Sequence, residues 1–449
     1  MTILLLAVAA VAAAVWVAVL LSHSGSLTPG RRAGIVFALA AFQPLVVLLL
    51  SARTVEATGA VSDVSGTVRL LGEAMNIVML AFAATLVLFP HERAGAAGRL
   101  LLGGVWGMAL ALFVANAFSP SPGSLRYELY FAVGFTAVVL GVPDRVTMML
   151  WGRRVLRVIV AVSLIAAVIA PGWAFIGKGT TGYDRTIFGI PRLTGLSPHP
   201  NDLSVIAVLA LLLEVGFRNG SRRTAVLAGT AAAACIILAQ SNTGYVAAAV
   251  GLLTLVAARR ASHRAMLAAT GLALLAVYLV NPGLLVPRRL TDSSYVDSVS
   301  GRTAIWRLSL DEWHRHVLTG YGSNMYSPTY LSSHFPINMQ QATNGHDQFV
   351  QTLADSGLLG VTALTAVLAG LVFCAWRARR VDGGLAIALV ATFLTFGITE
   401  TPLRVISVAA IPALVILATA LAGSRDAETV AVTATAATLQ PPGSDLAVA

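Results

Sequence analysis

A succession of long apolar runs, each close to the length that crosses a bilayer, constrains this chain more than any other feature. About 20 apolar residues span the hydrocarbon core as a helix, and in lipid a spanning segment must satisfy its own backbone polar groups. The sequence therefore predicts an all-α, polytopic transmembrane helix bundle of about 12–13 spans. Thirteen stretches qualify, approximately 3–21, 33–51, 74–90, 100–118, 127–142, 155–176, 202–217, 224–240, 244–258, 265–281, 353–376, 384–399 and 404–422.

Composition excludes the main alternatives. Of the 449 residues, 57% are hydrophobic and 11% are charged, and the mean hydropathy is +0.80. Soluble domains have roughly 45–50% apolar and about 25% charged residues. The sequence therefore excludes a soluble enzyme, a disordered protein and a disulfide-stapled secreted module. The two cysteines, Cys235 and Cys374, lie inside apolar runs and are expected to be small core residues.

The arginines predict an orientation. Cytoplasmic loops carry an excess of Arg and Lys, and alternate loops of this chain hold 18 of its 30 basic residues. We therefore expect the N-terminus outside the cell and the C-terminus inside. This orientation depends on an odd number of spans. The first span lacks a basic leader and is expected to be a retained helix.

This orientation divides the chain into membrane-spanning and extramembrane regions. The connection 52–73 is expected to hold a partial re-entrant segment. The regions are N-terminal transmembrane helices 1–176, an extracytoplasmic loop 177–201, central transmembrane helices 202–281, a long extracytoplasmic loop 282–346, C-terminal transmembrane helices 347–422 and a disordered cytoplasmic tail 423–449.

The long loop is expected to contain a short amphipathic helix. Ser300 is a suitable N-cap, and a helix running to about His316 aligns one apolar face, made of Trp306, Leu310, Trp313 and Val317. This face either lies in the membrane interface or packs on the bundle. Arg302 stands at the helix start, where the helix dipole favours an anion. A bound phosphate would therefore interact favourably with both the arginine and the helix N-terminus.

His346 is expected at the outer boundary of the next span. Imidazole can take a proton from a hydroxyl near neutral pH, and Asp347 or Asp355 is a candidate to orient the ring. The alternative is a structural histidine that makes hydrogen bonds.

The first outer loop also carries positive charge on the disfavoured side of the membrane. Arg185 and Arg192 can each grip a phosphate through two parallel hydrogen bonds. Their anionic partner is a lipid phosphate, either that of a specific ligand or that of ordinary headgroups. The following His199-Pro200-Asn201-Asp202 is typical of a turn into a capped helix.

Other signals are negative. The net charge of +10 is explained by topology and phosphate binding, so no nucleic-acid partner is expected. The sequence has no glycine-rich nucleotide loop, zinc spacing or Asp-rich metal cluster. Acidic residues are scarce within the spans: Glu214 lies near an inner end, and Glu400 lies at an outer end close to Arg404. Ion-driven transporters usually have midplane carboxylates, which makes a transporter the second choice.

Five motifs in order resemble the O-antigen ligase and polymerase family of bacterial membrane proteins. The resemblance covers about 185–375. The motifs are Arg192 with His199-Pro200-Asn201, then Ser241-Asn242-Thr243-Gly244, Ser300-Gly301-Arg302 with Trp306, Gly320-Tyr321-Gly322, and His346-Asp347 with Gly357 and Gly360.

The resemblance implies a metal-independent enzyme without cofactors, which moves a glycan from a polyprenyl pyrophosphate to an acceptor glycan or glycolipid. It implies that Arg302 binds pyrophosphate and that His346 is the catalytic base. Two positions depart from the family: Asn242 replaces an arginine, and Asp347 replaces Asn, Ser or Gln. Arg192 or Arg185 would then supply the missing charge. Supporting roles are expected for Asp347, His199, Asn201, Ser241, Asn242, Glu400 and Arg404.

The predicted function is thus a glycan ligase or polymerase that acts at the outer face of the membrane, by one inverting displacement. Ligases and polymerases share these motifs. The alternatives are a transporter or flippase of a lipid-linked glycan, which would not need His346, and a scaffold subunit of a wall-synthesis complex.

Overall fold

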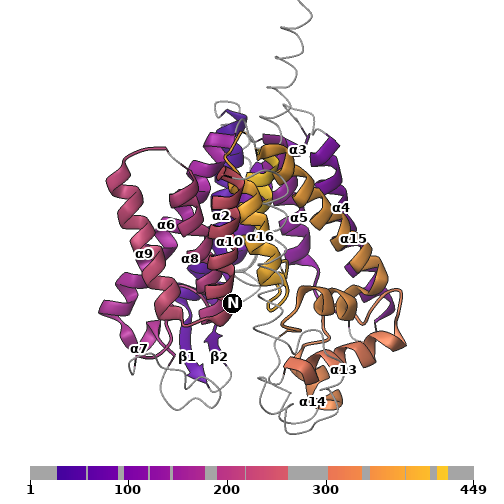
Figure 1. The fold of residues 1–449 in the computed structure, drawn as a ribbon. Coiled ribbons are helices and arrows are strands. Elements are labelled where there is room, and N and C mark those ends of the chain that lie inside the picture. The colour runs from indigo at the N-terminus through magenta and orange to yellow at the C-terminus, as the bar shows by residue number, and fades with distance from the viewer. Residues whose placement is uncertain are drawn as a thin grey trace, which may run out of the picture.

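The computed structural model describes residues 28–56, 59–88, 96–119, 122–141, 145–176, 190–217, 219–260, 302–335, 344–379, 381–404 and 412–422. They form a polytopic helical membrane protein (Figure 1). The helices are α2 (Pro29–Leu50), α3 (Gly66–Leu88), α4 (Ala96–Phe118), α5 (Arg126–Gly141), α6 (Arg145–Ile169), α7 (Pro171–Ala174), α8 (Pro200–Gly216), α9 (Arg222–Ala239), α10 (Asn242–Arg260), α13 (Arg302–Arg315), α14 (Pro328–His334), α15 (Gln348–Ala378), α16 (Leu385–Gly397) and the unlabelled helix Pro412–Ala422.

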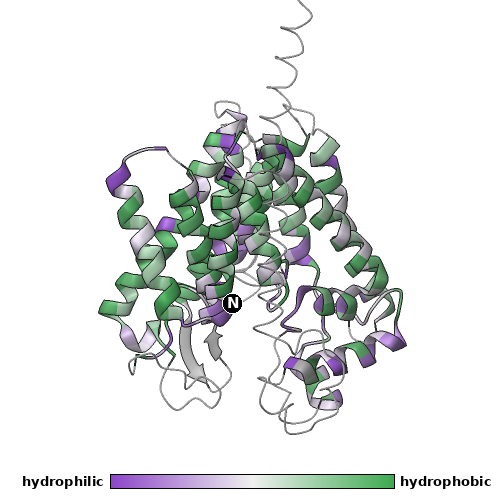
Figure 2. Ribbon diagram, viewed as in Figure 1, coloured by the Kyte–Doolittle hydropathy of each residue, from purple (hydrophilic) through white to green (hydrophobic). Residues whose placement is uncertain are grey.

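The predicted spans correspond closely to these helices. Helices occupy eleven of the thirteen predicted spans, whereas the predicted spans 3–21 and 265–281 lie outside the described residues. Five described helices (α2, α3, α4, α9 and α15) are long and apolar enough to cross a membrane. Figure 2 shows hydrophobic residues along the length of the bundle helices and a more polar lower end.

The connection after α2 differs from the prediction. Instead of a partial re-entrant segment, the chain forms an antiparallel hairpin of β1 (Ala52–Glu56) and β2 (Gly59–Asp63), with Ala52 opposite Asp63 and Glu56 opposite Gly59. The β-branched residues Thr54, Val55 and Val61 in this stretch favour strands. The two strands therefore satisfy each other's backbone groups.

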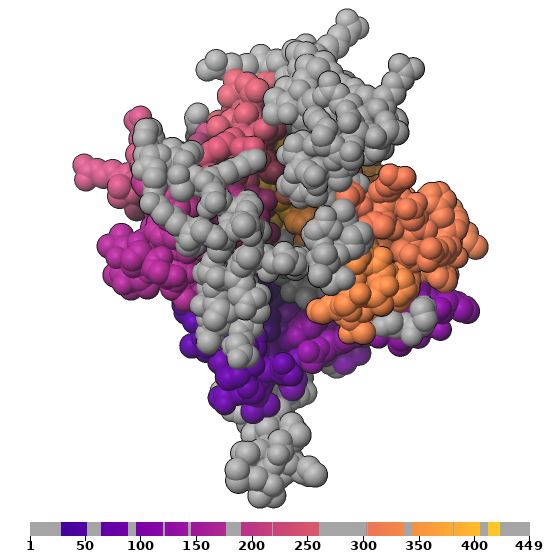
Figure 3. All heavy atoms as spheres, turned by 90° about the horizontal axis from the view of Figure 1, so that it is seen from below, coloured from indigo at the N-terminus to yellow at the C-terminus, as the bar shows by residue number. Residues whose placement is uncertain are grey.

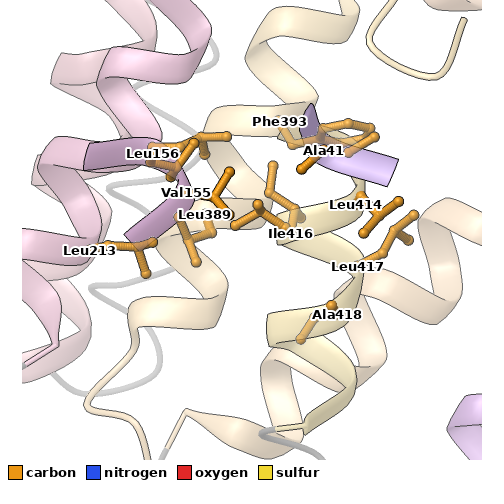
Figure 4. Packing of buried hydrophobic residues seen from close by; sticks show 14 of the residues in the cluster. Ala41, Val155, Leu156, Leu213, Leu389, Phe393, Leu414, Ile416, Leu417 and Ala418 are labelled. Carbon is orange, nitrogen blue, oxygen red and sulfur yellow. The ribbon is translucent and has the colours of Figure 1, made fainter. Parts of the chain in front are cut away.

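A central helix organises the packing. Every residue of Pro412–Ala422 is buried. Figure 4 shows Leu414, Ile416, Leu417 and Ala418 of this helix close to side chains from four other helices, namely Ala41 of α2, Leu156 of α6, Leu213 of α8, and Leu389 and Phe393 of α16. The bundle therefore closes around a helix that is apolar on all sides.

Helix α15 is interrupted where the long loop meets it. Gly357 has non-helical dihedrals (φ 59°, ψ −153°). At this break the backbone N–H groups of Leu358 and Tyr321 donate to the carbonyls of Val317 (3.0 Å) and Ala354 (2.7 Å). A Cβ atom on Gly320 would lie 2.6 Å from the Gly357 nitrogen. The paired glycines therefore allow the loop backbone to enter the helix break.

The long loop folds into a lobe with a small core of its own. Figure 3 looks onto the lower end of the molecule and shows the orange atoms of this lobe beside the purple region of α4 and α5. Asn116 at the end of α4 accepts a hydrogen bond from the backbone N–H of Ser323 (3.0 Å). The described core residues are Ile305, Tyr321, Met325, Tyr326, Tyr330, Leu331, Phe335 and Ala354.

The predicted amphipathic helix is present as α13, and the residues buried on it differ from the apolar face that the sequence aligns. Ile305 and Ser309 are buried, and the Ser309 hydroxyl lies 2.7 Å from the Tyr326 hydroxyl. Trp306 is half-buried and Val317 is exposed. A hydroxyl that bonds to the preceding turn and to a tyrosine can be buried at low cost, so Ser309 takes an inward position. The predicted cap Ser300 lies outside the described residues.

Candidate active site

Segments distant in the sequence meet at the lower end of the bundle in Figure 1, where β1, β2, α7, α13 and α14 also lie. The segment before α8 is fixed by an isolated bridge between Phe175 and Leu193 and by a hydrogen bond from the Leu193 N–H to Leu238 (2.8 Å). The starts of α8, α13 and α15 and the residues after α16 contribute side chains to one polar cluster.

Glu400 is at the centre of this cluster. Its Oε1 accepts hydrogen bonds from Asn201 Nδ2 (2.5 Å) and Arg302 Nη2 (3.0 Å). Its Oε2 lies 3.5 Å from His346 Nδ1. Burial of Glu400 opposes its ionisation, but the histidine contact and the Arg302 charge outweigh burial and lower the pKa of Glu400 to about 2. The carboxylate is therefore ionised at physiological pH.

Arg192 joins the same cluster through Asn201. The guanidinium is buried, with Nε donating to the carbonyl of Ala239 (3.1 Å) and Nη2 to Asn201 Oδ1 (3.0 Å). Asn201 therefore lies between a buried cation and the Glu400 carboxylate. Asn201 therefore combines the predicted place at the start of α8 with the supporting role that the resemblance implies. The cap of α8 is His199, and Asn201 directs its amide into the cluster.

The backbone around His346 is held from two directions. The residue has a left-handed conformation (φ 47°), and its N–H donates to Asn344 Oδ1 (2.7 Å). The preceding Gly345 donates its N–H to Gln351 Oε1 (2.7 Å) and accepts from Trp306 Nε1 (2.6 Å). Because Nδ1 faces Glu400, Nε2 is the nitrogen left to meet a substrate.

His199 has a structural role in the described geometry. Its Nδ1 accepts the backbone N–H of Asn201 (3.1 Å). Burial lowers the pKa of His199 to about 3, although the nearby Glu400 charge works in the opposite direction. The imidazole is therefore neutral at physiological pH, with one nitrogen engaged as a helix cap.

Asp347 is a helix cap and does not orient His346. Its carboxylate accepts the N–H of Val350 (2.8 Å) at the start of α15, and burial raises its pKa. Asp355 accepts from Gln351 Nε2 (2.6 Å). The carboxylate that faces the histidine thus comes from the segment after α16, because neighbouring residues at a helix start point in different directions.

Ser241 and Asn242 lie beside the cluster. The Ser241 hydroxyl is buried and accepts the N–H of Gly244 (3.1 Å), so it caps α10. The adjacent Thr243 hydroxyl lies 2.9 Å from that of Thr399, next to Glu400. Asn242 itself is exposed.

Of the two remaining arginines that the sequence predicts in the site, the structure describes Arg404 but not Arg185. The guanidinium carbon of Arg404 lies 6.0 Å from the centre of the Tyr326 ring. The backbone N–H of Arg404 donates to the carbonyl of Thr401 (3.0 Å). Arg185 lies outside the described residues.

Sequence reasoning missed two glutamines that fix the cluster. Gln351 holds Gly345, and Gln348 Oε1 accepts the N–H of Leu403 (2.9 Å), which joins α15 to the segment after Glu400. Gln348, Gln351, Thr352 and Asp355 recur at three- and four-residue intervals in an otherwise apolar helix. This polar stripe is the sequence feature that could have identified the two glutamines.

Comparison with known proteins agrees with the resemblance. The sequence model of the O-antigen ligase family matches residues 224–365, which include Ser241, Arg302 and His346. A search of curated proteins gave no match. Proteins of this family are in general ligases or polymerases of lipid-linked glycans. This multi-pass membrane chain is therefore similar to the O-antigen ligases over residues 224–365.

Proposed function

We propose that this protein transfers a glycan from a polyprenyl pyrophosphate to an acceptor hydroxyl at the outer face of the plasma membrane. The observation that carries the proposal is the shared carboxylate of Glu400, which lies 3.0 Å from Arg302 and 3.5 Å from His346. A guanidinium and an imidazole are thereby held side by side at one end of a membrane bundle.

Arg302 is the direct ligand of the departing pyrophosphate. It donates a hydrogen bond to Glu400 through Nη2, and a guanidinium carries five N–H donors. Negative charge grows on the pyrophosphate as the glycosidic bond breaks, so a fixed cation stabilises the transition state more than the ground state. The buried Arg192 adds its charge through Asn201 and replaces the family arginine at the position of Asn242.

His346 is the general base. The acceptor hydroxyl loses its proton to Nε2 while its oxygen bonds to the anomeric carbon. The bond from that carbon to the pyrophosphate breaks, and the bonding electrons leave with the phosphate oxygen. Glu400 faces Nδ1 and stabilises the imidazolium that forms, as a carboxylate does in a Ser-His-Asp triad. One displacement inverts the anomeric configuration.

The test uses the full-length protein in liposomes supplied with a labelled polyprenyl pyrophosphate glycan and an acceptor glycolipid. We expect His346→Ala and Arg302→Ala each to reduce transfer by roughly 100-fold or more. The matched controls are His314→Ala and Arg307→Ala, two exposed positions on α13, which should retain transfer. Equal rates in all four variants would contradict the proposal.

The same liposomes separate the rival functions. A transporter moves the intact lipid-linked glycan across the bilayer, and His346→Ala leaves that movement unchanged. A scaffold subunit neither transfers nor moves the lipid. Either result, obtained with protein that elutes as the wild type does, would replace the enzyme assignment.

Orientation has a separate test. Asp311→Cys on α13 and Ser221→Cys just before α9 each add one thiol at an exposed position. The two native cysteines are buried. An impermeant maleimide should label position 311 in intact cells and position 221 after permeabilisation. The reverse pattern would place the cluster in the cytoplasm.

A further inference from the structure

A second polar site lies inside the bundle, next to the Glu400 cluster. A cavity that is partly open to the outside is bounded by α4, α5, α15 and the segment at Leu403–Arg404. Its wall is apolar along α4, for example at Met108 and Ala109. Glu128, Asp355 and Arg404 make its opposite side polar.

Two carboxylate oxygens in this cavity lack partners. Glu128 Oε2 and Asp355 Oδ1 are buried and make no hydrogen bond within the part of the chain that the structure describes. Leaving a buried acceptor unsatisfied is costly, and such atoms call for a specific explanation. Carboxylate oxygens are acceptors, so the missing partners are O–H or N–H donors.

The cavity and the Glu400 cluster share a wall. Gln351 lines the cavity and bonds to both Asp355 (2.6 Å) and the backbone of Gly345 (2.7 Å), the residue before His346. Gln348 also lines the cavity and bonds to Leu403, three residues after Glu400. Only the Gln351 side chain therefore lies between a molecule that contacts it in the cavity and the backbone next to His346.

The two sides of this wall differ in charge. The Glu400 cluster combines the guanidinium groups of Arg192 and Arg302 with one carboxylate, which suits a diphosphate. The cavity combines two carboxylates with the one guanidinium of Arg404, which disfavours an anion and suits hydroxyl donors. Its apolar wall suits an alkyl chain.

We propose that this cavity binds the acceptor, as the hydroxyl-bearing sugar head of a membrane-anchored glycolipid. Glu128 and Asp355 accept hydrogen bonds from the sugar hydroxyls, and the apolar wall along α4 contacts the adjoining lipid chain. The acceptor role rests on the proposed glycan transfer, whereas the sugar-binding role rests on the cavity itself.

The experiment uses full-length protein in nanodiscs and two photoreactive probes with the same alkyl chain, one with a glucoside head and one with a phosphate head. We expect the glucoside probe to label peptides of α4, α5 and α15. Glu128→Gln and Asp355→Asn, which preserve side-chain volume, should each reduce this labelling at least five-fold. Equal labelling by the phosphate probe, or unchanged labelling in both variants, would overturn the proposal.

A pair of variants on α4 controls for folding. Ala109→Leu fills the cavity from its apolar wall and should abolish glucoside labelling, whereas Leu110→Phe changes a neighbouring side chain that is 62% exposed and should leave it unchanged. Glucoside labelling that follows these expectations in a protein without transfer activity would count against the proposed function alone. Loss of labelling in Leu110→Phe as well as in Ala109→Leu would count against the cavity.

Discussion

Arg302 and Glu400 are 98 residues apart in the sequence, yet Arg302 Nη2 lies 3.0 Å from Glu400 Oε1. This ion pair joins the start of the loop helix α13 to the residues that follow α16. The same carboxylate also meets Asn201 and His346. One acidic side chain thus organises groups from four parts of the chain, and several measurable consequences arise from it.

Replacing this carboxylate should slow catalysis far more than it changes binding. Glu400→Gln keeps the side-chain volume but removes the charge that faces His346. A carboxylate that orients a catalytic histidine contributes on the order of 10²–10⁴ in kcat, and we expect a loss at the lower end of that range. The measurement is the transfer rate at saturating donor. Glu312→Gln, whose carboxylate pairs with Arg315 on α13, is the control and should retain activity.

The ionisation of Glu400 should also contribute to stability in a definite pH window. Its pKa falls from an ordinary 4.5 to about 2 in the folded protein. The stabilisation is therefore fully present above about pH 4.5 and is lost as the pH falls towards 2. Thermal unfolding midpoints of wild type and Glu400→Gln should differ most at neutral pH and converge on acidification. A difference that widens at low pH would contradict this assignment.

Arg192 and Asn201 should behave as one unit. Asn201 connects the Arg192 guanidinium (3.0 Å) to Glu400 (2.5 Å), so either truncation breaks the same connection. In a double-mutant cycle, Arg192→Ala and Asn201→Ala should therefore be non-additive, with a coupling energy of about 0.5–3 kcal/mol. The cycle is measured on kcat/KM with the polyprenyl pyrophosphate donor. Additive losses would show that Arg192 acts independently of Asn201.

Gln351 should act as a positioning residue for His346. Gln351→Met has a similar volume but loses the bonds to Gly345 (2.7 Å) and Asp355 (2.6 Å). We expect kcat to fall about 10-fold, since small misplacements of a catalytic group are costly, and the donor KM to change little. Thr362→Val, which removes a hydroxyl bonded within the exposed part of α15, should leave both constants unchanged. A Gln351→Met effect confined to KM would argue for a binding role.

The break in α15 should tolerate no side chain. At Gly357 a Cβ atom would lie 2.5 Å from the Leu318 carbonyl, and φ is +59°. Gly357→Ala should therefore destabilise the protein by about 1–3 kcal/mol, seen as a lower unfolding midpoint in detergent. Gly103→Ala on α4 has open space around its Cβ position. Helix propensity favours alanine over glycine there, so its midpoint should stay the same or rise.

The sequence predicted most of the helices, because a bilayer requires each spanning helix to be an apolar run of about 20 residues. Such runs can be recognised in a single sequence. It did not predict the hairpin at 52–63 or the burial of Ser309 on α13. Ser309 is buried because Tyr326, 17 residues later, satisfies its hydroxyl. Such a partner is set by tertiary packing and leaves no mark on the periodicity of the helix.

The sequence predicted which residues belong to the candidate site, but not which of them contact each other. Arg192, Asn201, Arg302, His346 and Glu400 were all singled out, and the structure brings them together. The sequence predicts Asp347 or Asp355 as the partner of the histidine, whereas Glu400 comes from the segment after α16. Contacts across long separations depend on how helices pack, and the apolar pattern of one sequence does not specify that packing.

The backbone bonds at the break in α15 have a mechanical consequence. Since Tyr321 and Gly322 donate to the carbonyls of Ala354 and Asp355, the lobe and the first turns of α15 form one rigid unit that carries His346. Any widening of the site to admit a bulky saccharide must then occur where this unit meets the segment after α16. Such a movement has to break both the Arg302–Glu400 ion pair and the hydrogen bond between Gln348 and Leu403.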